Sequence, residues 1–478
     1  MQKEHEAYEG ALARPVNHWR VVGTVCVGSF MAALDASIVT VAIPTLHSFF
    51  HTSVATVEWV SIAYLLTLSS LLTAFGKVAD QLGRARMYRS GFLIFVVGSA
   101  LCGVAPTILF LIVARVLQAT GAAFLQANSV ALITHYTPPN ERGRAIGFQG
   151  AAQALGLSIG PAVGGALLAL FSWRALFYVN VPVGIAGTLL AAANLPPDAR
   201  GRRAYFDVVG AALQALFLVA LLWALGEGYV VGWLTPPILG AFGLAALALL
   251  GFLAWERRAR DPVLDLTLFA IPRFTFGNFS GLLSYTLMYG VLFLTPFGLE
   301  YVLGFPPSTV GVTLTAVPAA MSIVSPVAGA LADRYGARLL TTSGMAVGAL
   351  GTLLLAFGIS ARSLLLLVVG LALVGAGMGL FTPSNNASVM GTAPKEKLGM
   401  VGGFLNMTRS AGMSLGVALG GTIYASLLLM RIHTETPRLA QWPATAAALA
   451  PAYLAVGALA LVAAISSWIS PEFRTEED

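Results

Sequence analysis

Two ionisable residues stand inside long apolar stretches, where a charge is costly to bury. Asp35 follows Leu34 in the first stretch, and Arg115 interrupts a later one. An ionisable residue in the hydrocarbon region marks a functional site by default. Burial disfavours a charged carboxylate and a nearby cation favours it, so such a carboxylate can exchange a proton against a cationic group. The alternative is a structural ion pair without proton chemistry.

These two residues are predicted to lie at a similar depth. At ~1.5 Å per helical residue, Asp35 lies about 15 Å from the outer end of its segment near Thr45. Arg115 lies about 12 Å from the outer end of its own segment near Thr107. We therefore expect the two side chains to meet.

The composition predicts the elements that must carry this pair. Of the 478 residues, 57% are hydrophobic and 10% are charged, whereas about a quarter are charged in soluble proteins. A span takes about 20 apolar residues to cross ~30 Å of hydrocarbon, so the length allows roughly fourteen spans. We expect an all-α polytopic membrane protein with no soluble domain and no catalytic residues.

Charge and cysteine content argue against other classes. The net charge of +6 comes from short basic clusters between apolar stretches, so no nucleic-acid partner is expected. Cys26 and Cys102 lie inside apolar stretches, so neither a disulfide framework nor a metal site is expected. The first twenty residues are polar and no cleavage site follows the first apolar run, so we expect no cleaved signal peptide.

Apolar runs between polar segments predict fourteen spans. They lie near residues 20–45, 57–76, 87–106, 107–134, 144–171, 174–195, 206–226, 236–256, 274–299, 307–331, 339–359, 363–386, 400–428 and 447–469. Lysine and arginine concentrate on one side of the resulting topology, and the other side carries only Arg174, Arg362, Arg431 and Arg438. Cytoplasmic loops are enriched in these residues, so both termini are predicted to be cytoplasmic.

An internal repeat organises these spans. The turn at Gly76–Arg86 returns as Gly329–Arg338, after span 2 and span 10 respectively. The simplest arrangement is two six-helix bundles with two inserted helices between them. The expected parts are a cytoplasmic segment 1–19, a first bundle 20–195, a linker with two spans 196–273, a second bundle 274–469 and a cytoplasmic tail 470–478.

The repeated turn resembles the loop 2–3 signature of the major facilitator superfamily. Taken together, the segments of the chain resemble specifically its fourteen-span drug:proton antiporter branch. The resemblance runs from about Arg20 to Trp468 and implies the major facilitator fold. It also implies that the turn latches a gate. The gate residues are Gly76, Asp80, Gly83, Arg84 and Arg86, with Asp333 and Gly336 in the second copy. The alternative is that the basic residues only determine topology.

Three further segments carry the resemblance. The residues of span 5 that resemble the antiporter motif are Gly156, Gly160, Pro161, Gly164 and Gly165. Small residues allow close helix packing and a proline bends a helix, which suits a hinge; ordinary packing is the alternative. Span 1 resembles the branch signature with Thr40 in place of the usual Asn, and span 4 resembles its motif with Ala119 in place of Gly. The resemblance implies that Asp35 and Arg115 couple transport to protons.

Other candidates follow from their place on spans that line the family's central cavity. The substrate-cavity candidates are Tyr64, Gln126, Tyr285, Met288, Tyr289, Phe293, Asn385, Asn386 and Arg409, and packing is the alternative for most. Aromatic residues, methionine and a few amides suit an adaptable lipophilic cavity. Glu300 and Glu227 are expected near the outer surface as solvated acids, or as a periplasmic entry point for protons or cations.

The expected function is proton-coupled antiport in a bacterial cytoplasmic membrane, with both halves rocking about a midplane site. The cargo is expected to be a lipophilic, cationic drug or toxic compound. The energy source is the proton gradient, with no cofactor and no metal, and the protein is expected to be a monomer whose partners are its substrate, protons and lipid.

The sequence leaves other functions open. The closest is proton-driven export of a lipid, a siderophore or another metabolite, because the motifs report coupling and not cargo. A respiratory proton-pump subunit is a different class, but it is expected to place Lys, Glu and His at mid-membrane, and no His lies mid-span here. A receptor or scaffold leaves Asp35 without a role.

Overall fold

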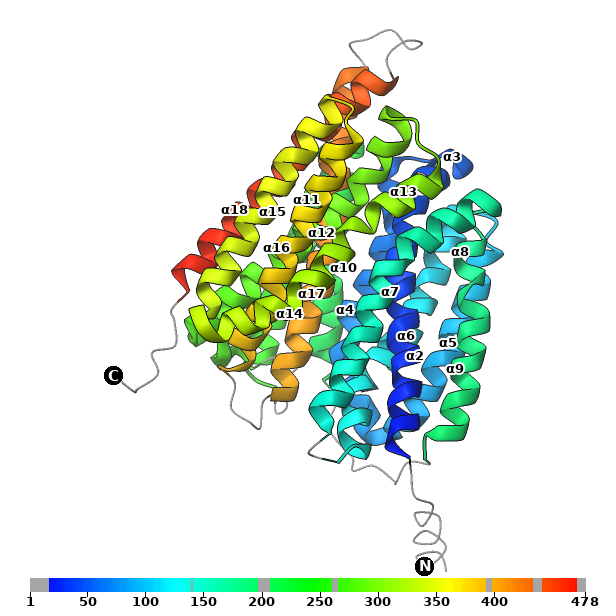
Figure 1. Ribbon diagram of the computed structural model, residues 1–478, viewed down its shortest axis with the longest axis vertical. Helices are drawn as coiled ribbons and strands as arrows, with labels where there is room; N and C mark the ends of the chain where they lie inside the picture. Colours follow the sequence, from blue (N-terminus) through cyan, green and yellow to red (C-terminus); the bar gives the residue numbers. More distant parts are fainter. Residues whose placement is uncertain are drawn as a thin grey trace, which may run out of the picture.

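The computed structural model describes residues 17–138, 141–196, 207–259, 265–392, 398–432 and 441–470. Within these ranges the chain is helical with short connections and has no strand. Most helices run along the long axis of the molecule (Figure 1). Thirteen described helices are long and apolar enough to cross a bilayer, which confirms the all-α membrane fold. A backbone that satisfies its hydrogen bonds within each segment is what hydrocarbon requires.

The first half contains six spans, two of them interrupted. Its helices are α2 (His18–Ile38), the 3₁₀ turn η1 (Val39–Ala42), α3 (Ile43–Phe50), α4 (Val54–Leu82), α5 (Arg84–Gly103), α6 (Ile108–Tyr136), α7 (Arg142–Leu170), α8 (Ala175–Tyr178) and α9 (Asn180–Asn194). Asn17, Ser53 and Thr107 cap α2, α4 and α6 by accepting from backbone N–H groups of the first turn. Polar caps thus set three of the helix starts.

Fourteen spans were expected and thirteen described helices qualify; the helix that does not qualify is α5. It begins with Arg84, Arg86 and Arg89, and it is not among the thirteen candidates. It nevertheless packs along α6 and α9 within the first half. Arginines at the end of a span keep their charged groups near the interface while their stems cover apolar surface.

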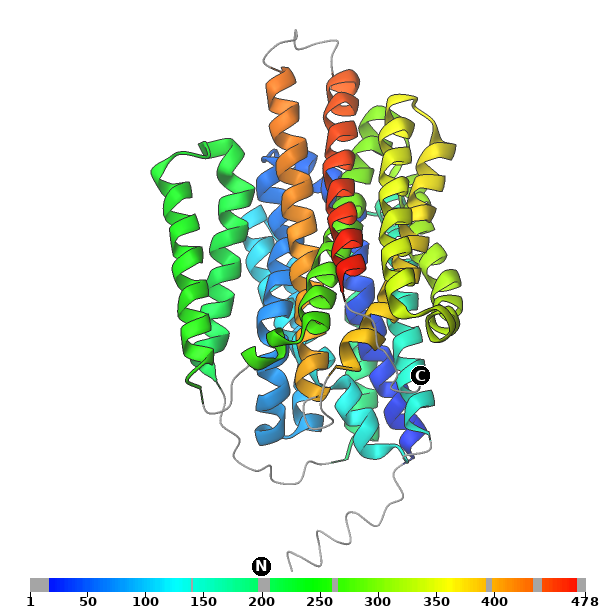
Figure 2. The ribbon, with the colours of Figure 1, turned by 90° about the vertical axis from the view of Figure 1, so that its left-hand side faces the viewer.

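Two inserted helices follow the first half. They are α10 (Val208–Val231) and α11 (Pro236–Glu256), which pack against each other. The green pair stands at one side of the molecule in Figure 2, and α10 contacts α4 and α17. Asp207 caps α10 by accepting from Gly210 N at 2.9 Å. The insert therefore touches the rest of the chain chiefly through α10.

The second half repeats the architecture of the first. Its helices are η2 (Leu266–Ala270), α12 (Pro272–Phe297), the π-helical segment η3 (Gly298–Val302), α13 (Pro307–Leu314), α14 (Ala316–Tyr335), α15 (Ala337–Ser360), α16 (Leu364–Met390), α17 (Leu398–Ile432) and α18 (Gln441–Ile469). The predicted span 307–331 is broken at Thr315, between α13 and α14.

Helix pairing is the same in the two halves. The pairs α2–α7, α5–α6, α4–α6 and α5–α9 of the first half correspond to α12–α17, α15–α16, α14–α16 and α15–α18 of the second. The repeated turn contains Gly83 at φ 99° and Gly336 at φ 82°, a region in which only glycine is unstrained. The division into two bundles at about residues 195 and 273 stays a prediction.

The two halves meet along a few helices. Helix α4 packs against α17, and α7 packs against α13 and α14. One continuous cluster of buried apolar residues includes members of both halves, from Val21 to Ala464. The candidate residues of span 5 therefore lie on a helix that reaches the junction, and η1 and α3, which continue span 1 beyond α2, contact α12.

Candidate functional site

Asp35 lies on α2 and is completely buried, with 0% exposure. Its Oδ2 accepts from Arg115 Nη1 at 2.5 Å. Its Oδ1 accepts from Gln118 Nε2 and from Asn180 Nδ2, each at 2.8 Å. One carboxylate oxygen thus faces the cation, while the other already accepts two amide protons.

Arg115 on α6 is equally enclosed, with 1% exposure. Besides Asp35, its Nη1 donates to Gln118 Oε1 at 2.6 Å and its Nε donates to Val60 O on α4 at 3.0 Å. The guanidinium lies 4.1 Å from the centre of the Tyr64 ring, a geometry that favours a cation. Four polar or aromatic groups therefore hold Arg115 in place.

Sequence reasoning missed three members of this cluster. Gln118 and Asn180 are 0% exposed and bind Asp35 directly, and Ser99 accepts from Gln118 Nε2 at 2.7 Å. Gln118 stands three residues after Arg115, so helical spacing alone places it on the same face. Asn180 is a single amide at the start of α9, and the only feature of the sequence that could have indicated it is a polar amide within an apolar span.

The glycines of α7 permit close contact with α2. A Cβ added at Gly156 would lie 2.5 Å from Phe30 O, and one added at Gly164 would lie 2.8 Å from Ile38 O. A Cβ at Gly160 would overlap the Ser37 hydroxyl, two residues after Asp35. Small residues on α7 therefore bring its backbone against the helix that carries the acid.

The same helix contacts the second half. A Cβ at Gly165 would overlap Pro307 O, and one at Gly311 of α13 would overlap Pro161 O. A Cβ at Gly311 would also lie 3.0 Å from Gly165 Cα. The five motif residues thus lie on one helix that touches α2 on one side and α13 on another.

We expect Gly156→Ala to destabilise the protein by about 1–3 kcal/mol, because the added methyl group meets backbone that has to move. Gly147→Ala on the same helix is the matched control. An added Cβ there has open space around it, so it should be neutral or gain up to ~1 kcal/mol of helix propensity. Thermal unfolding of the purified protein followed by intrinsic fluorescence measures both. Equal midpoints for the two variants would contradict the close contact.

A cavity of about 600 Å³ lies between the two halves. Its walls come from α2, α7, α12, α14 and α17, and they are mostly apolar. Tyr285, Met288 and Tyr289 of α12 line it, together with Arg409 of α17. The Arg409 guanidinium lies 5.2 Å from the centre of the Tyr285 ring. A drug-sized lipophilic molecule fits a cavity of this size and character.

Two smaller cavities adjoin this one and share Arg409 and Leu157 with it. Asn386 lines the first and Gln126 lines the second. Tyr289 also borders the second, and its hydroxyl is buried with no hydrogen-bond partner among the described residues. These three cavities together form a region that we call the central cavity.

Three predicted cavity residues lie elsewhere. Tyr64 lies under Arg115, and its hydroxyl donates to Ala32 O at 3.3 Å. Phe293 packs against Phe297 at 5.5 Å between ring centres. Asn385 faces away from its neighbour Asn386, because successive helical residues are ~100° apart around the axis.

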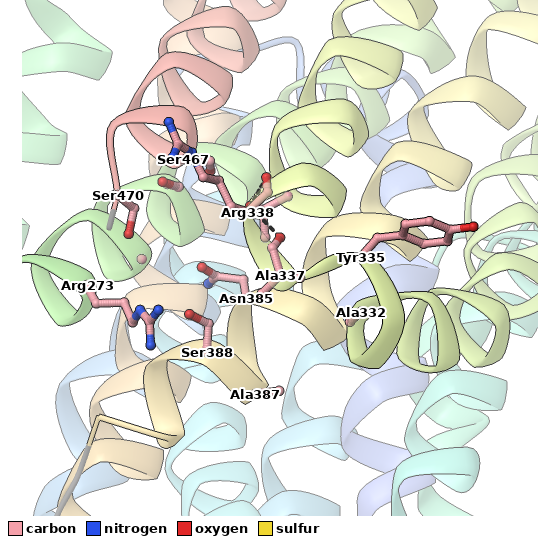
Figure 3. Close-up of a pocket in the computed structure, with 14 residues that line it drawn as sticks. Arg273, Ala332, Tyr335, Ala337, Arg338, Asn385, Ala387, Ser388, Ser467 and Ser470 are labelled. Carbon is pink, nitrogen blue, oxygen red and sulfur yellow. Dashed lines mark hydrogen bonds between the residues drawn. The ribbon is translucent and has the colours of Figure 1, made fainter. Parts of the chain in front are cut away.

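Asn385 instead lines a cavity of about 390 Å³ within the second half (Figure 3). Arg273 and Ser388 border this cavity with it, and Arg338 and Ser467 come from α15 and α18. The Arg338 guanidinium lies 4.3 Å from the centre of a Trp468 ring. This cavity is separate from the central one in its lining residues.

The gate motif is described only in part. Gly83 and Gly336 form the turns given above, and Arg84 and Arg86 begin α5. The side-chain surroundings of Gly76, Asp80 and Asp333 lie outside the described part of the structure. The latch role of this motif stays a prediction.

The two predicted outer acids are partly buried. Glu300 lies on η3, directly after α12, and its Oε1 has no hydrogen-bond partner within the described ranges. Glu227 lies near the outer end of α10. Neither is a fully solvated residue.

Fold and site together define a polytopic membrane transporter with a buried ion pair beside a central cavity. Comparison with known proteins supports the same class, that of membrane transporters. The Major Facilitator Superfamily model matches residues 25–256 and 277–476. The chain therefore belongs to the Major Facilitator Superfamily, whose members are membrane transporters and not enzymes. It is a multi-pass protein of the bacterial cytoplasmic membrane.

Curated relatives carry transporter names. The riboflavin transporter RibZ of Clostridioides difficile is 34% identical over 86% of this chain and 89% of its own length. The multidrug resistance protein Stp of Mycobacterium tuberculosis is 34% identical over 86% of this chain and 76% of its own length. A solved bacterial homologue of the lysosomal transporter Spinster, inward-facing and unoccupied, has TM-score 0.68 at 18% identity over 96% of this chain and 97% of its own, which shows a shared fold.

Proposed function

We propose that this protein is a proton-coupled antiporter that exports lipophilic aromatic compounds by alternating access. The observation that carries the proposal is the fully buried pair Asp35–Arg115, because an intramembrane carboxylate with a single cationic partner can trade that partner for a proton. The names of relatives such as Stp support the export of drugs.

The geometry suggests where the proton binds. Asp35 Oδ1 accepts two amide protons, so Oδ2 is the oxygen that can take a third. An O–H bond formed there removes the charge that attracts Arg115 Nη1, and a guanidinium offers no acceptor in return. Arg115 still donates to Val60 O and Gln118 Oε1, so protonation loosens α2 from α6 while the guanidinium keeps two hydrogen bonds.

A movement of α2 can be transmitted through α7 to the junction between the two halves. Ser37 lies against Gly160 of α7, and its hydroxyl donates to Gly156 O at 3.4 Å. The same α7 contacts α13 through Gly165 and Gly311. A shift of α2 on protonation can therefore change how α7 packs against the second half, which is the step that alternating access needs.

The central cavity narrows the class of cargo. Arg409 lines it, and no Asp or Glu is found among its described lining residues. The Tyr289 hydroxyl, which has no hydrogen-bond partner among the residues that the structure describes, adds a hydrogen-bonding group beside tyrosine and methionine side chains. This lining favours neutral or anionic aromatic compounds over the lipophilic cations expected from the sequence. The riboflavin transporter among the relatives suggests a planar metabolite as a second candidate cargo.

Inverted membrane vesicles test the proposed function. With an acidic lumen, vesicles containing the protein should accumulate a neutral flavin or an anionic xanthene dye, and ethidium should accumulate less. Ionophores that collapse the pH gradient and the membrane potential should abolish accumulation. Accumulation that persists without either gradient would overturn proton coupling.

Arg409→Gln tests the charge preference of the cavity. Removing the cation should weaken the transport of an anionic dye about tenfold, which corresponds to the loss of ~1.4 kcal/mol of binding free energy. Transport of a neutral flavin should change much less, because only the anion uses the charge. Arg362→Gln in an outer connection is the matched control. Equal losses for the neutral and anionic probes would contradict the assignment.

A further inference from the structure

Glu58 is a buried acid that the proposed transport site does not use. It lies in the second turn of α4, near the outer end of that helix, and is 0% exposed. Neither of its carboxylate oxygens has a hydrogen-bond partner in the part of the chain that the structure describes. A charged carboxylate in such surroundings is very costly, so the group becomes neutral instead.

Helices from three parts of the chain meet at this carboxyl group. A Cβ added at Gly421 of α17 would overlap Glu58 Oε1, so the carboxyl group lies directly against the backbone of α17. Thr422 on the same helix donates to Leu225 O of α10 at 2.7 Å. Helix α4 belongs to the first half, α17 to the second and α10 to the insert, which Figure 2 shows beside α17.

The inserted helix α10, which packs against α4, carries a second acid, Glu227. Glu227 of α10 is close enough for its charge to repel a carboxylate at Glu58. Arg115 on α6 is bound to Asp35 and Val60 O, and Arg409 on α17 lies over Tyr285. The remaining titratable groups on the helices packed against α4 are His18, Arg20, Cys26 and Asp35 on α2, His47 on α3, Arg84, Arg86, Tyr88, Arg89 and Cys102 on α5, His135 and Tyr136 on α6, Tyr229 on α10, and Tyr424 and Arg431 on α17.

We propose that Glu58 is a second proton-binding site, at which a bound proton holds α10 and α17 against α4. The proton comes from water on the outer side and forms an O–H bond on one carboxyl oxygen. Its loss leaves two carboxylates, Glu58 on α4 and Glu227 on α10, on two helices that are in contact. Repulsion and the need for water then separate α10 from the junction.

This site is distinct from the Asp35–Arg115 pair but shares a helix with it. Val60, which accepts from Arg115, stands two residues after Glu58. The two groups therefore lie on opposite faces of one turn of α4, since residues two apart do not share a helix face. The proposal therefore assigns a role to the inserted helices: the docking of α10 on α4 and α17 depends on the pH at the outer side. The inference does not require that transport itself is proton-coupled.

Distance measurement between spin labels tests the proposal without substrate or gradient. Labels are placed at Leu234→Cys, in the connection after α10, and at Met430→Cys near the end of α17, both exposed. The native Cys26 and Cys102 are replaced by serine, and the protein is held in lipid nanodiscs. We expect the ratio of molecules with α10 docked to molecules with α10 separated to change by up to about tenfold per pH unit across the titration, as a single proton site requires.

Glu58→Gln should keep the docked distance at every pH, because a neutral amide of the same shape replaces the acid. Glu58→Asp should retain a pH-dependent change, and Asp35→Asn should leave the change intact. Infrared difference spectra should contain a protonated carboxyl band at neutral pH that Glu58→Gln lacks. The proposal is overturned if α10 still separates from α17 at alkaline pH in Glu58→Gln, or if the two helices never separate in the protein with Glu58 intact. It is also overturned if the protonated carboxyl band is absent.

Discussion

Asp35→Asn is expected to abolish gradient-driven accumulation in inverted vesicles while downhill exchange of the same probe continues. The amide preserves the shape and the hydrogen bonds at Oδ1 but cannot take a proton at the position that faces Arg115. One proton moving through 100 mV supplies about 2.3 kcal/mol, which supports a concentration ratio of roughly 50-fold. This ratio is what the variant should lose.

The control for this experiment is Glu141→Gln. Glu141 lies at the cytoplasmic side, where it binds His18 at 2.8 Å, and it is partly exposed. Vesicles with the Glu141→Gln variant should accumulate the probe as well as vesicles with the unmodified protein do. If Asp35→Asn sustained the full gradient-driven ratio, Asp35 would not be the coupling residue, whatever the effect on expression.

Arg115→Leu is expected to have the largest effect on stability. Removing one partner of a buried pair leaves the other charge uncompensated, at a cost of about 3–5 kcal/mol. Arg115 also donates to Val60 O and Gln118 Oε1, so these acceptors lose a partner as well. Thermal unfolding of the purified variant should show a clearly lowered midpoint.

A double variant separates the charge from the packing. Asp35→Asn combined with Arg115→Leu removes both charges and should recover a substantial part of the stability lost by Arg115→Leu alone. Strictly additive losses in the two single variants and the double variant would mean that the pair contributes no coupling energy. Lower pH should also stabilise Arg115→Leu, because Asp35 can then take a proton in place of its cation.

The class of structure and the position of the ion pair along its helices could both be predicted from the amino-acid sequence. Hydrocarbon can only accept segments that satisfy their own backbone hydrogen bonds, so 57% hydrophobic residues in long runs specify membrane helices. The rise per residue then places Asp35 and Arg115 at one depth, and the structure brings them to 2.5 Å. Polar residues at Asn17, Ser53 and Thr107 mark helix starts by the same local logic.

Which face of each helix contacts which neighbour is known only from the packing in the folded protein. Hydropathy is high all round these helices, so it carries little information about rotation about the helix axis. Asn385 and Asn386 are adjacent in sequence but line different cavities, and Tyr64 lies under Arg115 instead of in the central cavity. The burial of Glu58 follows from the packing of α4, α10 and α17, because residues far apart in the chain exclude water from it and, within the described ranges, provide no hydrogen-bond partner.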